Sequence, residues 1–223
     1  MDKPLLRQAL VKFFAGLVCV MLLLFLPAGT LRYPQGWLLI AILFLPMFIA
    51  GLVMLAKSPA LLRERLKAKE PEAEQRFVVL GSGLLFAAVF IIAGLSFRWQ
   101  LLMLPLSASR VAALVFLAAY ALYGEVLREN AYLSRTVKVQ EGQKVIDSGL
   151  YGVVRHPMYA ATVLLFLTMP LVLGSVVSFA VMLLYLPLLV KRIRSEEQVL
   201  ERGLPGYRDY EKRVKYRLVP FLW

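Results

Sequence analysis

The chain of 223 residues contains one cysteine, Cys19, and one histidine, His156. A single cysteine excludes an internal disulfide framework and a CxxC metal or redox pair. A single histidine excludes His-rich zinc sites such as HExxH, so we expect no metal site. Charged residues are also scarce, at 18%, whereas soluble domains average about 25%.

Hydrophobic residues are correspondingly abundant, at 60% of the chain, compared with about 45–50% in soluble domains. A soluble globule of this composition would expose large apolar patches and aggregate. The same composition excludes a disordered chain, a collagen and a coiled coil. The sequence therefore predicts an integral membrane protein.

Runs without Asp, Glu, Lys or Arg predict where the chain crosses the bilayer, because a spanning helix needs about 20 mostly apolar residues. Three such runs cover residues 13–31, 33–56 and 77–97, and a fourth span at about 107–127 is apolar between Arg110 and Glu125. The first run follows basic residues, as a signal peptide would. It is too long for a signal core and lacks a convincing cleavage site, so we expect an uncleaved span.

A fifth neutral run, residues 157–190, is too long for one span. As a single helix it would measure roughly 50 Å, compared with a bilayer core of about 30 Å. Gly174 and Ser175 at its middle predict a turn between two short helices, which Pro170 and Pro187 kink or shorten. The expected fold class is thus all-α and polytopic, with about six transmembrane segments, or five if the C-terminal hairpin is partly re-entrant.

The basic residues predict the orientation. With six spans, 23 of the 26 Lys and Arg residues fall on one side, and only Arg32, Arg98 and Arg110 fall on the other. By the positive-inside rule, the 23 face the cytoplasm together with both termini. We expect a multi-pass protein of a bacterial cytoplasmic membrane. The net charge of +12 then indicates contact with anionic membrane lipids and no nucleic-acid partner, because the basic patches lack interleaved aromatic residues.

This topology divides the chain into two predicted parts. Residues 1–127 hold four N-terminal membrane helices and the cytoplasmic loop 57–76. Residues 128–223 hold a cytoplasmic loop, the hairpin 157–190 and a tail, and we expect them to form the catalytic region. The chain has no GxGxxG, GxxxxGK[ST] or GxSxG motif.

The segment GLYGVVRHPMY, residues 149–159, leads into the hairpin. Its glycines allow a turn, and Pro157 suits the first position of a helix. His156 would then lie at the helix N-terminus, beside free backbone N–H groups that can receive an anion. A plain alternative is a basic helix start at the interface, with Tyr151 and Tyr159 as aromatic anchors.

The segment KRIRSEE, residues 191–197, follows the second helix of the hairpin. On a continued helix, Arg192 and Glu196 share one face, which a solvated salt-bridged helix end would also explain. A hairpin returns its exit beside its entry, however. Arg155 and His156 are therefore expected to meet residues 192–197 at the cytoplasmic surface. That group of cations, anions and aromatic rings would suit a zwitterionic ligand that carries an aromatic group.

These residues resemble a known family. The RHPxY element, the hydrophobic hairpin and RIxxEE are similar to the isoprenylcysteine carboxyl methyltransferase family and its phospholipid methyltransferase relatives. The resemblance runs from about 143 to 220 and includes Gly149, Tyr207, Tyr210 and the closing RLVP at 217–220. The segment SPALLRER, residues 58–65, also looks like a loop of bacterial members. The chain differs at Ala161, where the family often has Gly, and at Gln143, where it often has His.

The resemblance implies methyl transfer from S-adenosylmethionine (SAM), with S-adenosylhomocysteine (SAH) as product, to a lipidic or prenylated small molecule. Arg192 would orient a substrate carboxylate, and Glu196 is the second residue expected to be catalytic. Glu196 or Glu197 would hold the cofactor ammonium, and His156 and Tyr159 its carboxylate. The residues implied for the cofactor are Val145, Ile146, Tyr151, Arg155, His156, Pro157, Tyr159, Glu196 and Glu197.

Three alternatives stay open. The acceptor could be the carboxylate of an isoprenylcysteine-like substrate or the amine of a phospholipid, and an amine would need a carboxylate such as Glu197 to accept a proton. A membrane reductase of the sterol type is a second possibility, since such enzymes resemble this family in their C-terminal region but bind NADPH. The cations Arg192, Arg194 and Arg202 would then face its 2′-phosphate. A non-enzymatic scaffold or small transporter is the third and ranks last, because the spans contain few ionisable residues that could form an ion path.

Overall fold

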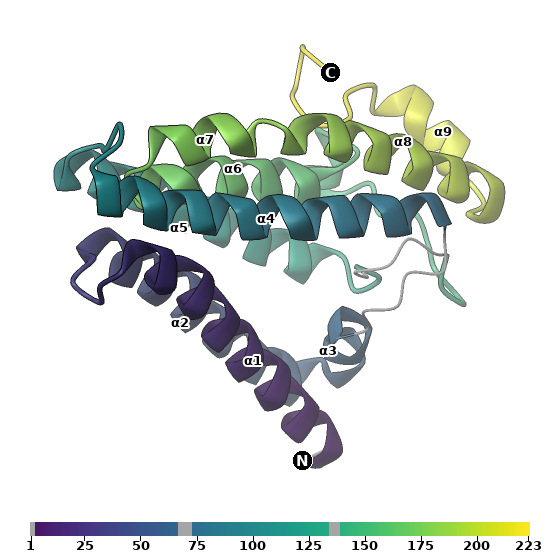
Figure 1. The fold of residues 1–223 in the computed structure, drawn as a ribbon. Coiled ribbons are helices and arrows are strands. Elements are labelled where there is room, and N and C mark those ends of the chain that lie inside the picture. Colours follow the sequence, from purple (N-terminus) through teal and green to yellow (C-terminus); the bar gives the residue numbers. More distant parts are fainter. Residues whose placement is uncertain (1–2, 67–72, 134–138) are drawn as a thin grey trace.

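The computed structural model describes residues 3–66, 73–133 and 139–223, and within these ranges the chain is built from helices (Figure 1). Five helices or helix pairs are long and apolar enough to cross a membrane, and α6 is a shorter apolar helix. This agrees with the predicted all-α fold of about six spans. The helices are α1 (Lys3–Ala28), α2 (Pro34–Lys57), α3 (Pro59–Leu66), α4 (Ala73–Trp99), α5 (Leu106–Glu129), α6 (Pro157–Val172), α7 (Val176–Met182), α8 (Tyr185–Gly203) and α9 (Tyr207–Arg213).

The predicted spans correspond to α1, α2, α4, α5 and the hairpin formed by α6 with α7 and α8. Helices α4, α5, α6 and the arm made of α7 followed by α8 lie side by side, whereas α1 and α2 cross them at an angle (Figure 1). α3 lies within the segment 57–76 that we expected to be a loop. Two of its residues, Leu61 and Leu62, are buried, so α3 packs onto the protein.

The hairpin turns where the sequence predicts it. Gly174 has a positive φ of 75°, and its carbonyl accepts a hydrogen bond from the Leu104 amide at 2.7 Å. A Cβ on Gly174 would lie 3.3 Å from the Leu104 carbonyl, so a side chain here would meet both an unfavourable φ and the connection between α4 and α5. The turn of the hairpin thus packs against that connection.

The second arm of the hairpin is interrupted between α7 and α8, at Leu183 and Leu184. Pro187 explains the interruption, because it has no N–H to give to the Leu183 carbonyl four residues earlier. The Leu186 amide bonds to that carbonyl instead, at 3.1 Å. Pro187 therefore kinks this arm, as the sequence predicted.

Buried hydroxyl groups join the hairpin turn to α4 and α2. Ser175 Oγ donates to Ser96 Oγ at 3.0 Å, and Ser178 Oγ donates to the Val89 carbonyl at 3.0 Å. The hydroxyl of Tyr33 donates to the Leu173 carbonyl at 2.5 Å. Because each hydroxyl has a partner, these polar groups stay buried at low cost and hold the turn in position.

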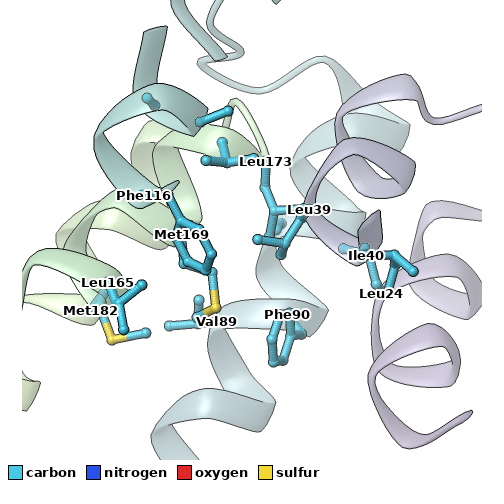
Figure 2. Packing of buried hydrophobic residues seen from close by; sticks show 14 of the residues in the cluster. Leu24, Leu39, Ile40, Val89, Phe90, Phe116, Leu165, Met169, Leu173 and Met182 are labelled. Carbon is cyan, nitrogen blue, oxygen red and sulfur yellow. The ribbon is translucent and has the colours of Figure 1, made fainter. Parts of the chain in front are cut away.

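The apolar core lies between α1, α2, α4, α5 and the hairpin. Figure 2 shows Phe116, Met169 and Leu39 at the centre of this packing, with Val89 and Phe90 of α4 beside them. Large apolar side chains also point outward, for example Leu26 at 70% exposure and Leu114 at 68%. In a bilayer these outward side chains meet lipid, so the fold confirms an integral membrane protein.

Candidate functional site

The site begins in the turn before α6. Residues Gly149–Gly152 form a single 3₁₀ turn, in which Gly149 has a φ of 53°. The carboxylate of Glu129, at the end of α5, accepts a hydrogen bond from the Leu150 amide at 3.1 Å. This turn directs the chain back to the start of α6, where His156 is the N-cap and Pro157 the first helical residue.

The C-terminal segment pairs with the chain at this helix start. The amides of Arg155 and His156 donate to the carbonyls of Tyr216 and Arg217, each at 2.9 Å. Within α6, the amides of Tyr159 and Ala160 both bond to the His156 carbonyl. The set of free N–H groups expected here is therefore smaller than the sequence indicates, because the tail and the helix itself use several of them.

Glu197 connects both arms of the hairpin with the tail. Its Oε1 accepts hydrogen bonds from Arg155 Nε at 2.9 Å and from Arg155 Nη2 at 2.8 Å. The same oxygen lies 3.2 Å from His156 Nε2. Its Oε2 receives Arg217 Nε at 2.7 Å. The Glu197 side chain is buried, and both of its oxygens have cationic partners. The predicted meeting of residues 155–156 with residues 192–197 is thus confirmed, and Arg217 is an added member.

The Arg155 guanidinium makes further bonds to the tail. Its Nη1 donates to the carbonyls of Val214 and Lys215, at 2.9 and 3.0 Å. Its Nη2 also lies 3.7 Å from Glu211. A buried arginine with this many partners fixes the position of the segment that follows α9, because each bond has a defined direction.

A second group of polar side chains lies beside the first. The Tyr159 hydroxyl donates to Glu196 Oε2 and accepts a hydrogen bond from Arg192 Nε at 2.9 Å. Tyr159 is buried, whereas Arg192 and Glu196 are partly exposed. Consecutive residues on a helix point about 100° apart. Glu196 consequently faces this group while Glu197 faces the tail.

A pocket of about 820 Å³, with the solvent at its mouth included, opens beside these side chains. Eight of the residues implied by the resemblance line it: Val145, Ile146, Tyr151, Arg155, His156, Tyr159, Arg192 and Glu196. Pro157 and Glu197 are absent from this lining in the part of the chain that the structure describes.

The pocket has further walls beyond the residues predicted to bind cofactor or substrate. Gln143, one of the two departures from the family pattern, lines it, whereas the fully buried Ala161 is not among the described lining residues. Leu200 and Leu204 continue the face of Glu196 at intervals of four residues, a spacing that could have identified them. The other lining residues are Asn130, Tyr132, Leu133, Lys144, Met158, Tyr207 and Tyr210.

Tyr151 is held from two directions. Asn130 Nδ2 donates to its hydroxyl at 3.0 Å, and the Tyr210 hydroxyl donates to its carbonyl at 2.7 Å. Burial raises the pKa of both Tyr151 and Tyr210, so both phenols stay neutral. Tyr210 thereby joins α9 to the turn that precedes α6.

The pocket combines three chemical features. Glu196 provides a carboxylate, Arg192 and Lys144 provide cations, and Val145, Ile146 and the Tyr151 ring provide an apolar and aromatic lining. A carboxylate and a cation together can hold the two ends of a zwitterion, and an apolar and aromatic wall can hold a planar ring. The residues present therefore fit a ligand such as SAM. Within the described residues, no group of three or more His, Cys, Asp or Glu could hold a metal ion.

Comparison with known families agrees with this geometry. Residues 111–202 match the isoprenylcysteine carboxyl methyltransferase (ICMT) family. The ICMT segment runs from α5 through the turn and the hairpin and ends just before the end of α8. It confirms the resemblance seen in RHPxY and RIxxEE. Together with the apolar helices, it supports an integral membrane methyltransferase.

One curated relative is a delta(14)-sterol reductase, TM7SF2, of the mouse Mus musculus. It is 32% identical over 91 residues, which make up 40% of this chain and 22% of the relative. The chain therefore spans about a fifth of the length of that reductase.

Proposed function

We propose that the protein is a SAM-dependent membrane methyltransferase that esterifies the carboxylate of a hydrophobic acceptor, such as an isoprenylcysteine-like molecule. The observation that carries this proposal is the pocket where Glu196 and Arg192 both contact Tyr159 beside an apolar wall. The ICMT match covers the same elements. The site thus has an anion for the cofactor and a cation for an acidic acceptor.

In this proposal, Glu196 holds the ammonium of the cofactor, and Val145, Ile146 and Tyr151 hold its adenosyl part. Arg155, His156 and Tyr159 form the wall beside its amino-acid end. When bound, SAM supplies a methyl group on a positively charged sulfur, which makes that carbon electrophilic. The protein then has mainly to align the two reactants and to exclude water from between them.

Glu197 acts differently from Glu196. Arg155, His156 and Arg217 already contact its two oxygens, so a cofactor ammonium would have to displace one of these side chains. We assign Glu197, together with Pro157, to positioning: Glu197 holds Arg155 and His156, and Pro157 starts α6. The pocket-facing carboxylate for the cofactor is that of Glu196.

The acceptor chemistry follows from the same contacts. A carboxylic acid is ionised at neutral pH, so its oxygen attacks without a general base, and Arg192 orients it. An amine acceptor must lose a proton. Glu197 is a poor proton acceptor for that step, because the guanidinium groups of Arg155 and Arg217 stabilise its ionised form. This contrast favours a carboxylate over a phospholipid amine.

The pocket lies at the end of the bundle opposite to the hairpin turn and the short α1–α2 and α4–α5 connections (Figure 1). By the positive-inside rule this end faces the cytoplasm, and both termini lie on the same side. A water-soluble cofactor enters from there, and a lipidic acceptor reaches the pocket from the bilayer.

A sterol-type reductase that uses NADPH is the second candidate, and the similarity to the mouse reductase favours it. Of the three arginines that could face a 2′-phosphate, Arg192 lines the pocket. Arg194 lines a different groove on α8, and Arg202 is absent from the described lining. Glu196 in the pocket would repel a phosphate. The charge arrangement therefore supports a zwitterionic ligand more than a phosphorylated one.

Thermal unfolding of the detergent-purified protein separates the two candidates. A ligand that binds the folded state raises the melting temperature. We expect SAH to raise it and NADPH to leave it unchanged, and we expect Glu196→Gln to lose most of the SAH effect. A rise with NADPH alone would replace the methyltransferase by a reductase.

The acceptor is identified by incubation with methyl-labelled SAM and lipid extracts. A methyl ester releases its label as volatile methanol in base. We expect base-labile label in an acidic lipid fraction. Base-stable label in amines would instead establish a phospholipid N-methyltransferase.

A further inference from the structure

The hydroxyl of Tyr207 has no role in the site as described so far. Tyr207 is the first residue of α9, is 4% exposed and lines the pocket with Glu196 and Leu200. Its Oη is buried and has no hydrogen-bond partner within the described residues. A buried hydroxyl without a partner is costly, so such a group in a pocket calls for an explanation.

Packing accounts for the ring of Tyr207 but not for its oxygen. The ring belongs to a small buried cluster with Leu204, Tyr210 and Val214. A phenylalanine would fill that space equally well. Tyr210, three residues later, shows the contrast, because its hydroxyl donates to the Tyr151 carbonyl at 2.7 Å. One tyrosine of α9 therefore completes a bond within the protein, whereas the other, which lines the pocket, has a buried hydroxyl with no bond to the described residues.

The charges around Tyr207 indicate what its oxygen can bind. Burial, and then the negative charges of Glu197 and Glu196, raise the pKa of the Tyr207 phenol. Glu197 is neutralised by Arg155 and Arg217, whereas Glu196 faces the pocket. A neutral hydroxyl in a negative field offers its lone pairs to a cationic donor. An ammonium carries three N–H groups, so a carboxylate and a hydroxyl can share it.

We propose that Tyr207 Oη accepts a hydrogen bond from the ammonium group of the bound ligand and shares that cation with Glu196. The ligand class is an amino acid or amine joined to an adenosyl group. This assignment rests on the proposed function for the identity of that ligand. It adds a binding residue at the amino-acid end of the pocket, supplied by the tail and not by the hairpin.

Three ligands that differ only at the amino-acid end test the assignment. SAH carries both the ammonium and the carboxylate, S-adenosylthiopropylamine keeps only the ammonium, and methylthioadenosine lacks both. Their affinities are measured by calorimetry for the full-length wild-type protein and for Tyr207→Phe. We expect the variant to bind the first two ligands about tenfold more weakly or worse, because a hydrogen bond to a charged group is lost. Its affinity for methylthioadenosine should equal that of the wild type.

Stability of the ligand-free protein provides a separate readout. The Tyr207→Phe variant should keep or slightly raise the wild-type melting temperature, because it removes an unpartnered polar group. The matched variant Tyr210→Phe should lower it, because it removes a made bond. A Tyr207→Phe variant that melts earlier or loses methylthioadenosine binding would show a structural role and overturn the assignment.

The remaining outcomes are equally decisive. Weaker binding of SAH alone would place the hydroxyl on the ligand carboxylate and overturn the ammonium assignment. Equal affinities of wild type and Tyr207→Phe for SAH would overturn it while the proposed function stands. If the wild type binds none of the three ligands, the proposed function fails and this assignment fails with it.

Discussion

Arg155 and Glu197 form a buried ion pair in which two guanidinium nitrogens, Nε and Nη2, lie 2.9 and 2.8 Å from the same carboxylate oxygen. The pair joins the start of α6 to the end of α8, and it binds the tail through Arg217 and through the Val214 carbonyl. The pocket opens beside it. The ion pair therefore holds together the three segments that supply the pocket walls.

The first prediction compares the two neighbouring glutamates. Glu197→Gln removes the nearest counter-charge of the buried Arg155, which keeps Glu211 at 3.7 Å, and loss of one partner of a buried pair costs about 3–5 kcal/mol. Glu196→Gln removes a pocket-facing charge from a partly exposed position, so it should change stability little. We expect a large drop in melting temperature for Glu197→Gln alone. For Glu196→Gln, we expect weaker SAH binding at an unchanged melting temperature, measured by calorimetry. The reverse pattern would exchange the two roles.

The spans and the hairpin were predictable because a bilayer restricts the solutions so strongly. A neutral run of 34 residues, 157–190, cannot be one span, and Gly174 offers a turn at its middle. A helical hairpin returns its exit beside its entry, so Arg155 and Glu197 are expected to lie close together. This inference needs only helix length and chain connectivity.

The separate roles of Glu196 and Glu197 depend on how α8 is rotated about its axis, which the resemblance did not reveal. A signal was present in the sequence, because Tyr185, Leu189, Ile193 and Glu197 form one buried stripe with a spacing of four residues. The backbone pairing of Arg155 and His156 with the tail had no such signal. It joins residues about 60 positions apart, and loop segments without periodicity do not predict their partners.

The second prediction concerns Tyr210 and the turn before α6. Tyr210→Phe keeps the ring in its buried cluster but removes the hydrogen bond to the Tyr151 carbonyl. The loss leaves that buried carbonyl short of a donor, which costs about 1–3 kcal/mol. We expect a lower midpoint in denaturant unfolding of the detergent-solubilised protein. An unchanged midpoint would mean that the contact adds nothing to stability.

The third prediction is a loss of stability in alkali. Burial raises the pKa of Tyr151, Tyr207 and Tyr210 above their ordinary value, so the folded state keeps protons that the unfolded state releases. Their contribution is complete below the unfolded pKa of about 10 and is lost as the pH rises above it. We expect the melting temperature to fall as the pH is raised from about 9 to about 11. The fall should be smaller in Tyr210→Phe, and equal falls would exclude Tyr210 from the effect.

The fourth prediction concerns Gly149. A Cβ at this residue would lie 1.6 Å from Glu129 Oε1, and its φ is 53°. Gly149→Ala must therefore displace the Glu129 carboxylate from the Leu150 amide and also adopt an unfavourable backbone, at a combined cost of about 2–4 kcal/mol.

Gly142→Ala is the matched control for Gly149, since Gly142 has a φ of 69° with nothing within 4 Å of the added Cβ. It should cost only the backbone part, about 1–2 kcal/mol. In a Glu129→Ala background, Gly149→Ala should cost no more than this control, because the obstacle is gone. An undiminished cost in that background would show that Glu129 is not what the side chain meets.

The fifth prediction concerns the contact between α1 and α4. A Cβ on Gly94 would lie 2.4 Å from the Leu24 carbonyl and 3.0 Å from the Ala28 amide, so the backbones of α1 and α4 are close at this residue. Gly94→Ala must push the helices apart, and overpacking of this kind costs about 1–3 kcal/mol. Gly83→Ala, on the same helix α4, meets nothing within 4 Å and should be neutral or stabilising. Thermal unfolding of both variants checks this: a lower melting temperature is expected for Gly94→Ala alone, and equal temperatures would mean that α1 and α4 separate without cost.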